Sequence, residues 1–122
     1  MTKTILVVDD DEFMRQIIGL VLNDAGYEMI ESCDGNDALD KLGKRKVNLI
    51  ISDVNMQNMD GIAFVKAVRD LPNHKVTPII MLSVGFSNTL RQEALEAGVK
   101  AWMVKPFDRD KLLEMVTRFA LP

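Results

Sequence analysis

Short apolar runs alternate with amphipathic segments five times along this chain, and this alternation limits the folds open to it. The runs are rich in branched residues and show no helical period, so each is predicted to be a short buried strand. They cover residues 5–8, 27–32, 47–53, 79–82 and 101–104. Five strand–helix units in succession predict a parallel sheet with helices on both faces.

The amphipathic segments predict five helices with recognisable ends. Each helix follows a residue whose side-chain oxygen can accept hydrogen bonds from the free N–H groups of the first turn. The predicted capping residues are Asp10 or Asp11, Asp60 and Asp108, whereas the second helix follows the turn Asp34-Gly35 and the fourth begins at Ser87 or Asn88. In the first helix, one face is predicted to be buried: Met14, Ile17, Ile18, Val21 and Leu22. The fourth helix has the weakest apolar stripe of the five, formed by Leu90, Ala94 and Ala97.

The run 47–53 is predicted to lie at the centre of the sheet, and it ends in a carboxylate, Asp53. The first and third strands have the most buried character, which favours the strand order 2-1-3-4-5 with right-handed crossovers. The predicted fold is therefore α/β, doubly wound, a flavodoxin-like (βα)5 arrangement of three layers. A length of 122 residues suits a single domain over residues 1–122.

Composition narrows the function classes. The net charge of −3 argues against general nucleic-acid binding, which requires a basic face. The single cysteine, Cys33, excludes an intramolecular disulfide, fits a reducing compartment and is predicted to be a small apolar filler. The first apolar run is too short for a signal peptide or a membrane span. We expect a cytoplasmic, monomeric protein with no membrane or nucleic-acid partner.

Polar residues follow four of the predicted strands and should meet at one edge of the sheet. They are Asp9, Asp10, Asp53, Ser83 and Lys105. Neighbouring carboxylates repel one another unless a cation lies between them, and oxygen ligands suit Mg²⁺. Lys105 adds a fixed positive charge and Ser83 a hydroxyl donor. Together these groups could position a phosphoryl group in transfer, with Asp53 as the nucleophile.

Several motifs resemble the receiver domain of bacterial response regulators, and the resemblance spans essentially the whole chain. The motifs are Ile-Leu-Val-Val-Asp-Asp at 5–10, Asp53 followed by Met56 and Met59-Asp60-Gly61, Ser83, and Lys105-Pro106-Phe107. The stretch Lys100 to Phe107, with Met14-Arg15-Gln16, Asn55-Met56, Leu71-Pro72 and Thr77-Pro78, is most similar to the stand-alone chemotaxis type.

The resemblance implies a role for each position of the predicted site. Asp53 would accept a phosphoryl group from a phosphohistidine on a sensor histidine kinase. Asp10 and Asp53 would ligate Mg²⁺ directly, Asn55 through its backbone carbonyl, and Asp9 through water. Lys105 would contact the phosphoryl oxygens, and the bond from Lys105 to Pro106 would be cis.

The resemblance also implies how a signal would leave the site. Ser83 would move toward the phosphoryl group, and Trp102, at the position of the switch aromatic, would follow it. The altered surface would be that of the fourth helix, fifth strand and fifth helix. A flagellar motor switch protein or another docking effector would bind there, and a phosphatase is a further candidate partner.

Some residues depart from the family pattern or allow other interpretations. Gln57 stands where the family usually has Pro, which would loosen the loop carrying Asn55. Asp11 is a third acid after the pair, with no assigned contact to metal. His74 lies in a polar loop and is predicted to be solvated.

The leading hypothesis is a phosphorylation-activated switch without turnover chemistry beyond its own phosphotransfer and dephosphorylation. The alternative is a receiver that acts as a phosphate sink or as a docking module without a motor partner. A hydrolase would need a specificity loop for which the chain has little space. A flavin-binding module would need a phosphate loop after the first strand, where three acids stand instead.

Overall fold

The computed structural model describes residues 2–56, 58–85 and 87–122. Its five parallel strands form one sheet in the order β2-β1-β3-β4-β5. The strands are β1 (Thr4–Val8), β2 (Glu28–Ser32), β3 (Leu49–Asp53), β4 (Ile79–Ser83) and β5 (Ala101–Val104). The predicted doubly wound α/β fold and its strand order are therefore confirmed.

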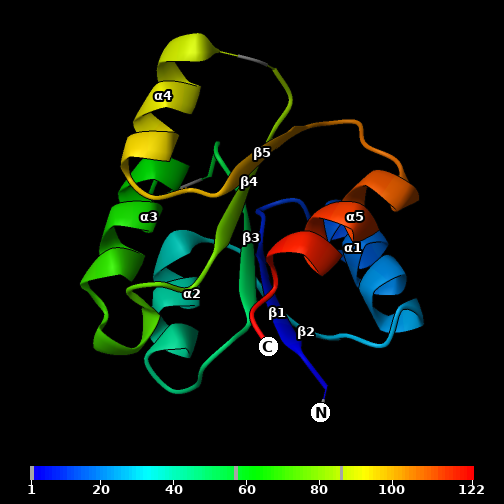
Figure 1. Ribbon diagram of the computed structural model, residues 1–122. Coiled ribbons are helices and arrows are strands. Elements are labelled where there is room, and N and C mark those ends of the chain that lie inside the picture. Colours follow the sequence, from blue (N-terminus) through cyan, green and yellow to red (C-terminus); the bar gives the residue numbers. More distant parts are fainter. Residues whose placement is uncertain (1, 57, 86) are drawn as a thin grey trace.

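Five α-helices and one 3-10 turn connect the strands. They are α1 (Glu12–Asp24), α2 (Gly35–Leu42), α3 (Gly61–Asp70), η1 (Pro72–His74), α4 (Asn88–Glu96) and α5 (Arg109–Phe119). Figure 1 shows α1 and α5 on one face of the sheet and α2, α3 and α4 on the other. Each helix begins after a capping side chain that accepts a backbone hydrogen bond: Asp11, Asp34, Asp60, Ser87 and Asp108. The predicted caps Asp60 and Asp108 are confirmed, and Asp11 rather than Asp10 caps α1.

The core consists of two apolar layers, one on each face of the sheet. Alternate residues of the central strands supply both layers, because side chains along a strand point to opposite faces. Ile50 and Met81 pack with α2, α3 and α4, whereas Ile51 and Ile80 pack with α1 and α5. All residues of β1, β3 and β4 are buried, which fixes these strands at the centre.

Gly61 allows α3 to begin close behind the end of β3. A Cβ atom at this position would lie 2.7 Å from the Cα atom of Val54 and 2.9 Å from the carbonyl oxygen of Asp53. Because both neighbours are backbone atoms, a larger residue would push the start of α3 away from the strand. The small residue at Gly61 therefore helps to set the position of the segment that follows Asp53.

Three predictions about individual residues were wrong. His74 is buried, with 1% of its surface exposed, and its ring nitrogens contact the Leu42 carbonyl at the end of α2 and the Thr77 hydroxyl. Cys33 is exposed, since it follows the last residue of the edge strand β2. Ile17 is 37% exposed, because α1 buries a narrower face centred on Ile18 and Leu22.

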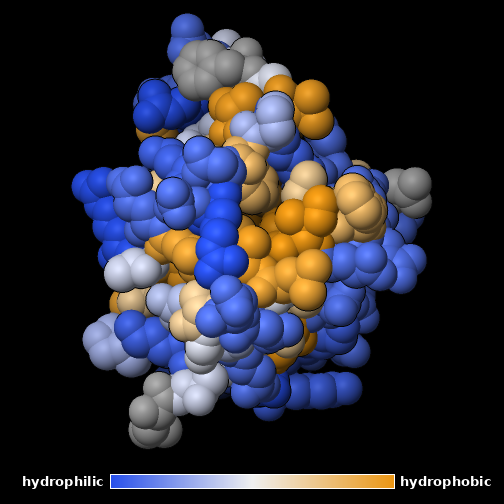
Figure 2. Space-filling view, turned by 90° about the vertical axis from the view of Figure 1, so that its right-hand side faces the viewer, coloured by the Kyte–Doolittle hydropathy of each residue, from blue (hydrophilic) through white to orange (hydrophobic). Residues whose placement is uncertain are grey.

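The exposed side of α1 carries further apolar residues, Phe13 at 68% and Leu20 at 73% exposure. Figure 2, which views the molecule from the side of α1 and α5, shows apolar surface near the centre of this face. In the part of the chain that is described, no helix combines the length and the apolar character needed to cross a membrane.

Candidate functional site

Three carboxylates meet at the carboxyl edge of the sheet. Asp9 and Asp10 follow β1, and Asp53 is the last residue of the adjacent β3. Each of the three offers an oxygen atom, and these oxygens lie within 4.8 Å of one another. Asp9 is fully buried and Asp53 is 7% exposed, whereas Asp10 faces solvent. The site therefore has two buried acids at its base and one acid at its mouth.

Lys105 extends from the end of β5 to the two buried acids. Its Nζ atom donates to Asp9 Oδ2 at 2.9 Å and to Asp53 Oδ2 at 3.4 Å. Burial lowers the pKa of the Lys105 ammonium, but the hydrogen bond to Asp9 and the charges of Asp53 and Asp9 outweigh that effect and raise it overall. Lys105 therefore remains a cation that neutralises part of the acidic charge. The predicted cis bond between Lys105 and Pro106 is confirmed.

Asp53 has a carboxyl group whose pKa is raised above its ordinary value of 3.8. Burial is the largest cause, because it penalises the charged form. The charge of Lys105 lowers the pKa, and the nearby charge of Asp9 raises it again. One lysine thus does not fully compensate two buried acids, and a further cation at this place would stabilise their ionised forms.

Backbone and side-chain contacts hold Asp9 and Asp53 in position. The Asp9 N–H donates to the carbonyl of Ser32 at 3.1 Å, and Asp9 Oδ1 accepts from the Asp11 N–H at 2.9 Å. Asp53 Oδ1 accepts a longer bond of 3.4 Å from the Asn55 N–H. Asp11, the third acid in the sequence, caps α1 by accepting a hydrogen bond from the Phe13 N–H.

Arg15 also belongs to the site, and sequence reasoning missed its role. Its guanidinium donates to the backbone carbonyl of Asp9 at 2.6 Å and to Glu31 at 2.8 Å. These contacts tie the first turn of α1 to the segment that carries the acids. The available signal was its position one helical turn after Asp11, which returns its side chain toward the end of β1.

Ser83 and Trp102 form a pair beside the acidic cluster. The Trp102 Nε1–H donates to Ser83 Oγ at 2.8 Å, and the Ser83 hydroxyl donates to the carbonyl of Gly85. Ser83 is 2% exposed and lies at the end of β4, next to β3. The structure therefore brings Ser83 to the predicted edge but engages its hydroxyl with Gly85 and Trp102 rather than with a carboxylate.

Asn55 is at the start of the loop between β3 and α3, two residues after Asp53. Its side chain is exposed. The predicted loosening of this loop by Gln57 lies outside the described residues. Taken together, Asp9, Asp10, Asp53, Asn55 and Lys105 bring oxygen donors and one cation to a single edge.

The donor set fits a small hard cation such as Mg²⁺. Carboxylate oxygens are the protein ligands that Mg²⁺ prefers, and it usually keeps several water ligands beside one or two carboxylates. The cluster contains three acids, so two of them can ligate the ion directly, and Asp10 is open to solvent. The incomplete compensation of Asp53 by Lys105 also favours a second positive charge here.

Comparison with known proteins places these residues in a family. Residues 5–117 match the model of the response regulator receiver domain. The chain belongs to the receiver domain family. The resemblance that the motifs predicted is thereby confirmed.

Relatives of this receiver domain include stand-alone proteins. The chemotaxis protein CheY of Bacillus subtilis is 34% identical over 119 residues, which cover 97% of this chain and 98% of that protein. The structure of chemotaxis protein CheY4 from Vibrio cholerae is 43% identical, with a TM-score of 0.94 and coverage of 98% and 99%. Both similarities extend over nearly the full length of each chain.

A receiver domain from a sensor histidine kinase has the same fold. That domain, from PA1611 of Pseudomonas aeruginosa, is 26% identical, with a TM-score of 0.89 and 98% coverage of both chains. Its structure contains a magnesium ion coordinated in the active-site cleft. The receiver fold therefore occurs among these relatives both as a separate chain and as part of a kinase.

Proposed function

We propose that this receiver domain accepts a phosphoryl group on Asp53 from a phosphohistidine of a histidine kinase. The observation that carries the proposal is the placement of the Asp53 carboxylate at the carboxyl edge of the sheet. There it lies against the Lys105 ammonium at 3.4 Å and within a cluster with Asp9 and Asp10. This arrangement combines an oxygen nucleophile with positive charge that can bind phosphoryl oxygens.

In the proposed transfer, an Asp53 oxygen forms a bond to phosphorus while the bond from phosphorus to the histidine nitrogen breaks. The electron pair of the broken bond stays on the imidazole nitrogen of the donor. Lys105 binds a phosphoryl oxygen and stabilises the charge that the group carries between donor and acceptor. Hydrolysis of the resulting acyl phosphate by water would return the carboxylate.

The proposal includes a Mg²⁺ site formed by Asp10, Asp53 and the backbone carbonyl of Asn55, with Asp9 acting through water. The ion would supply positive charge that lets the acids and a phosphoryl group approach one another. Asp9 and Lys105 hold Asp53 in place, and Arg15 holds the backbone of Asp9. The coordinated magnesium in the PA1611 receiver domain supports the choice of ion.

Phosphorylation would be read out through Ser83 and Trp102. To reach a phosphoryl oxygen, the Ser83 hydroxyl must release the Gly85 carbonyl, which would draw the loop before α4 inward. Trp102 would follow, because its indole N–H is bonded to the same hydroxyl oxygen. The changed surface would be that of α4, β5 and α5. Only Ala94 of α4 is buried, so this helix can shift at low cost.

The biological setting that we propose is chemotaxis, with a flagellar motor switch protein as the docking partner in the cytoplasm. The similarity to CheY and CheY4 over nearly their full lengths supports this choice. The similarity to the PA1611 domain supports the alternative, a receiver that passes or stores phosphate near a kinase. The two differ in whether phosphorylation creates affinity for a motor component.

The test is intact-mass measurement of the protein incubated with Mg²⁺ and acetyl phosphate. We expect a covalent phosphoryl adduct on the native protein and none on Asp53→Asn. Asp60→Asn is the control, because it keeps a hydrogen-bonding cap on α3 and should still form the adduct. An adduct that persists in Asp53→Asn would overturn the assignment. Binding of the phosphorylated form to motor switch protein then separates chemotaxis from phosphate storage.

A further inference from the structure

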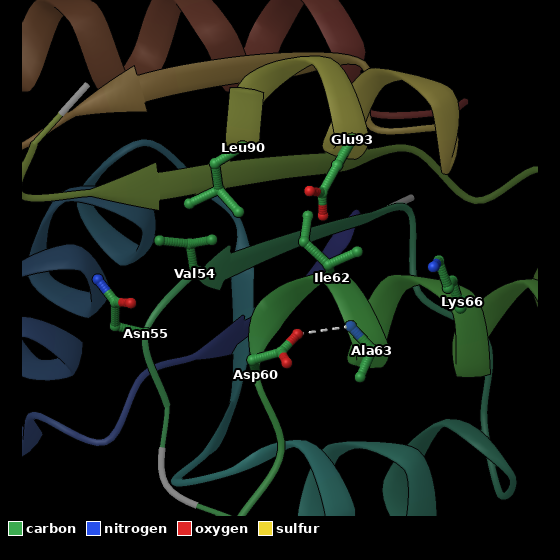
Figure 3. A pocket seen from close by; sticks show the side chains of 8 residues that line it. All are labelled: Val54, Asn55, Asp60, Ile62, Ala63, Lys66, Leu90 and Glu93. Carbon is green, nitrogen blue, oxygen red and sulfur yellow. Dashed lines mark hydrogen bonds between the residues drawn. The ribbon is translucent and has the colours of Figure 1, made fainter. Parts of the chain in front are cut away.

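A cavity of about 410 Å³ lies between α3 and α4, beside the loop that follows Asp53. Its size falls within the range of about 300 to 1,000 Å³ typical of sites for small molecules. Figure 3 shows side chains from both helices directed into it, with Leu90 and Glu93 reaching from α4 toward Val54 and Ile62. None of these four side chains belongs to the acidic cluster.

The floor of the cavity is apolar. Val54 and Ile62 are 4% and 7% exposed, and Leu90 is partly buried above them (Figure 3). Leu90 is on the helix with the fewest buried residues, so its apolar surface is only partly covered by the rest of the protein. An apolar group placed here would cover mainly the exposed part of Leu90 and contact the small exposed areas of Val54 and Ile62.

The rim of the cavity carries more negative than positive charge. It contains the carboxylates of Asp60 and Glu93 and the ammonium of Lys66. Asp60 Oδ1 accepts the capping hydrogen bond from the Ala63 N–H at 2.8 Å, drawn as a dashed line in Figure 3. Among the described residues, neither Glu93 nor Lys66 takes part in an ion pair. Glu93 is therefore an exposed carboxylate beside an apolar floor, without an ion-pair partner among the described residues.

We propose that this cavity, the α3–α4 cavity, binds small amphipathic cations: an apolar group on the floor and an ammonium or guanidinium group at Glu93. Both halves are needed for binding. An exposed carboxylate contributes little to the binding of a simple cation, and three apolar side chains alone do not select for charge. Lys66 opposes the cation and limits its affinity.

The position of the cavity links it to the phosphorylation site. Val54 follows Asp53 directly, and α4 follows the loop that begins after Ser83. A ligand in contact with both Val54 and Leu90 therefore joins the two segments on either side of that site. This inference rests on the proposed function. We infer that phosphorylation changes the affinity of the cavity for its ligand, and linkage then requires that the ligand change the phosphorylation equilibrium by the same factor.

Binding is tested with 2-phenylethylammonium added to the ¹⁵N-labelled native protein and followed by NMR. We expect saturating shifts of the amides around Ile62 and Leu90. The neutral 2-phenylethanol, the anionic 3-phenylpropanoate and ethylammonium should each bind at least about fivefold more weakly. Equal binding of phenylethanol would overturn the role of charge. Shifts confined to the surroundings of Asp9 and Asp10 would show attraction to the acidic cluster instead.

Substitutions on the rim give a second test. The substituted side chains are exposed, so each variant should fold as the native protein does. Glu93→Gln should weaken binding about fivefold, and Lys66→Gln should strengthen it about twofold. Glu96→Gln, on the same helix but outside the cavity, is the matched control and should leave affinity unchanged. An equal effect of Glu93→Gln and Glu96→Gln would overturn the site.

The link to phosphorylation is tested separately with beryllofluoride, a phosphoryl analogue. We expect the affinity for 2-phenylethylammonium to change at least about threefold when the analogue is bound to Asp53. An unchanged affinity with the analogue bound would reject the link but not the cavity site. Failure of the analogue to bind would count against the proposed function. It would not affect the test of 2-phenylethylammonium binding to the α3–α4 cavity.

Discussion

The two edges of the sheet carry different kinds of buried polar group. At the carboxyl edge, Asp9 and Asp53 share one ammonium, and the pKa of Asp53 is raised because burial is not fully offset. At the amino edge, buried polar groups have hydrogen-bond partners, although burial lowers the pKa of Arg69, whose partners are neutral carbonyls. This difference separates the part of the molecule that can react from the part that only holds loops in place.

His74 and Arg69 organise the amino edge. His74 Nε2 meets the carbonyl of Leu42 at 2.9 Å, and Nδ1 meets the Thr77 hydroxyl at 3.0 Å. Arg69 donates to the carbonyls of His74, Thr77 and Gly98 at 2.8 to 3.1 Å. These bonds join the end of α2, the turn η1 and the residues that follow α4, so three connections are held by protein hydrogen bonds.

Clustered acids that share one cation therefore distinguish the reactive edge in this fold, since an uncompensated acid costs stability unless binding compensates it. Variants at the two edges should therefore differ in kind. Changes at the amino edge should lower stability and leave phosphorylation intact. Changes at the carboxyl edge should alter phosphorylation, and one of them should raise stability.

The largest expected effect is at the amino edge. His74→Ala should lower the free energy of unfolding by about 3 kcal/mol, because it removes two hydrogen bonds and leaves buried partners unsatisfied. Urea unfolding measures this loss, with Asn73→Ala in the exposed part of the same turn as the control. Adduct formation at 25 °C should stay within about twofold of native. A stability loss no greater than that of Asn73→Ala would contradict the comparison.

The next effect is at the carboxyl edge. Lys105→Met should slow adduct formation with acetyl phosphate at least about tenfold, because the ammonium that binds the phosphoryl oxygens is lost. Time-resolved intact-mass measurement gives the rate. Lys100→Met, an exposed lysine before β5, is the control and should react at the native rate. An unchanged rate in Lys105→Met would show that Lys105 serves only to hold the acids.

A smaller effect tests how much stability the folded protein loses by burying the ionised Asp53. Because the pKa of Asp53 is raised on folding, the folded state holds its proton more tightly, and ionisation above pH 3.8 lowers stability. Asp53→Asn should therefore raise the free energy of unfolding at pH 7 by about 1 kcal/mol. This gain should fade as the pH falls toward and below 3.8, where the native carboxyl is protonated in both states.

Urea unfolding at pH 7 and pH 3.5 measures the gain, and Asp70→Asn, exposed at the end of α3, is the control. Addition of Mg²⁺ should stabilise the native protein at pH 7 more than Asp53→Asn, since the ion would bind the ionised acids. If Asp53→Asn lowered the free energy of unfolding at pH 7, burial of the ionised Asp53 would not be destabilising the native protein.

The smallest expected effect concerns the pair beside the site. Trp102→Phe removes the indole donor from Ser83 and should change the rate of adduct formation by no more than about twofold. In the native protein, Trp102 is the single tryptophan, so its fluorescence should change when beryllofluoride binds. The fluorescence change should be reduced in Ser83→Ala, and an undiminished change would argue against coupling through the hydroxyl.

Much of the fold and of the acidic cluster could be predicted because both depend on local pattern. The end of each strand could be predicted from the end of an apolar run. Parallel strands place these ends at one edge of the sheet, so Asp9, Asp53 and Lys105 were correctly predicted to lie together. Arg15 was missed because its partner is a backbone carbonyl, so only its position one helical turn after Asp11 pointed to the contact. His74 was misjudged because the residues around it in sequence are polar, while its partners Leu42 and Thr77 come from packing.

The sequence by itself determined the class of fold, the helix caps and the set of residues at the carboxyl edge, since each follows from periodicity or from a residue beside a strand end. Only the tertiary structure decided how well each buried polar group is compensated. Compensation depends on distances between side chains from separate elements, such as Lys105 and Asp9, 96 residues apart. For the same physical reason, the α3–α4 cavity and its charged rim had no counterpart in any single stretch of sequence.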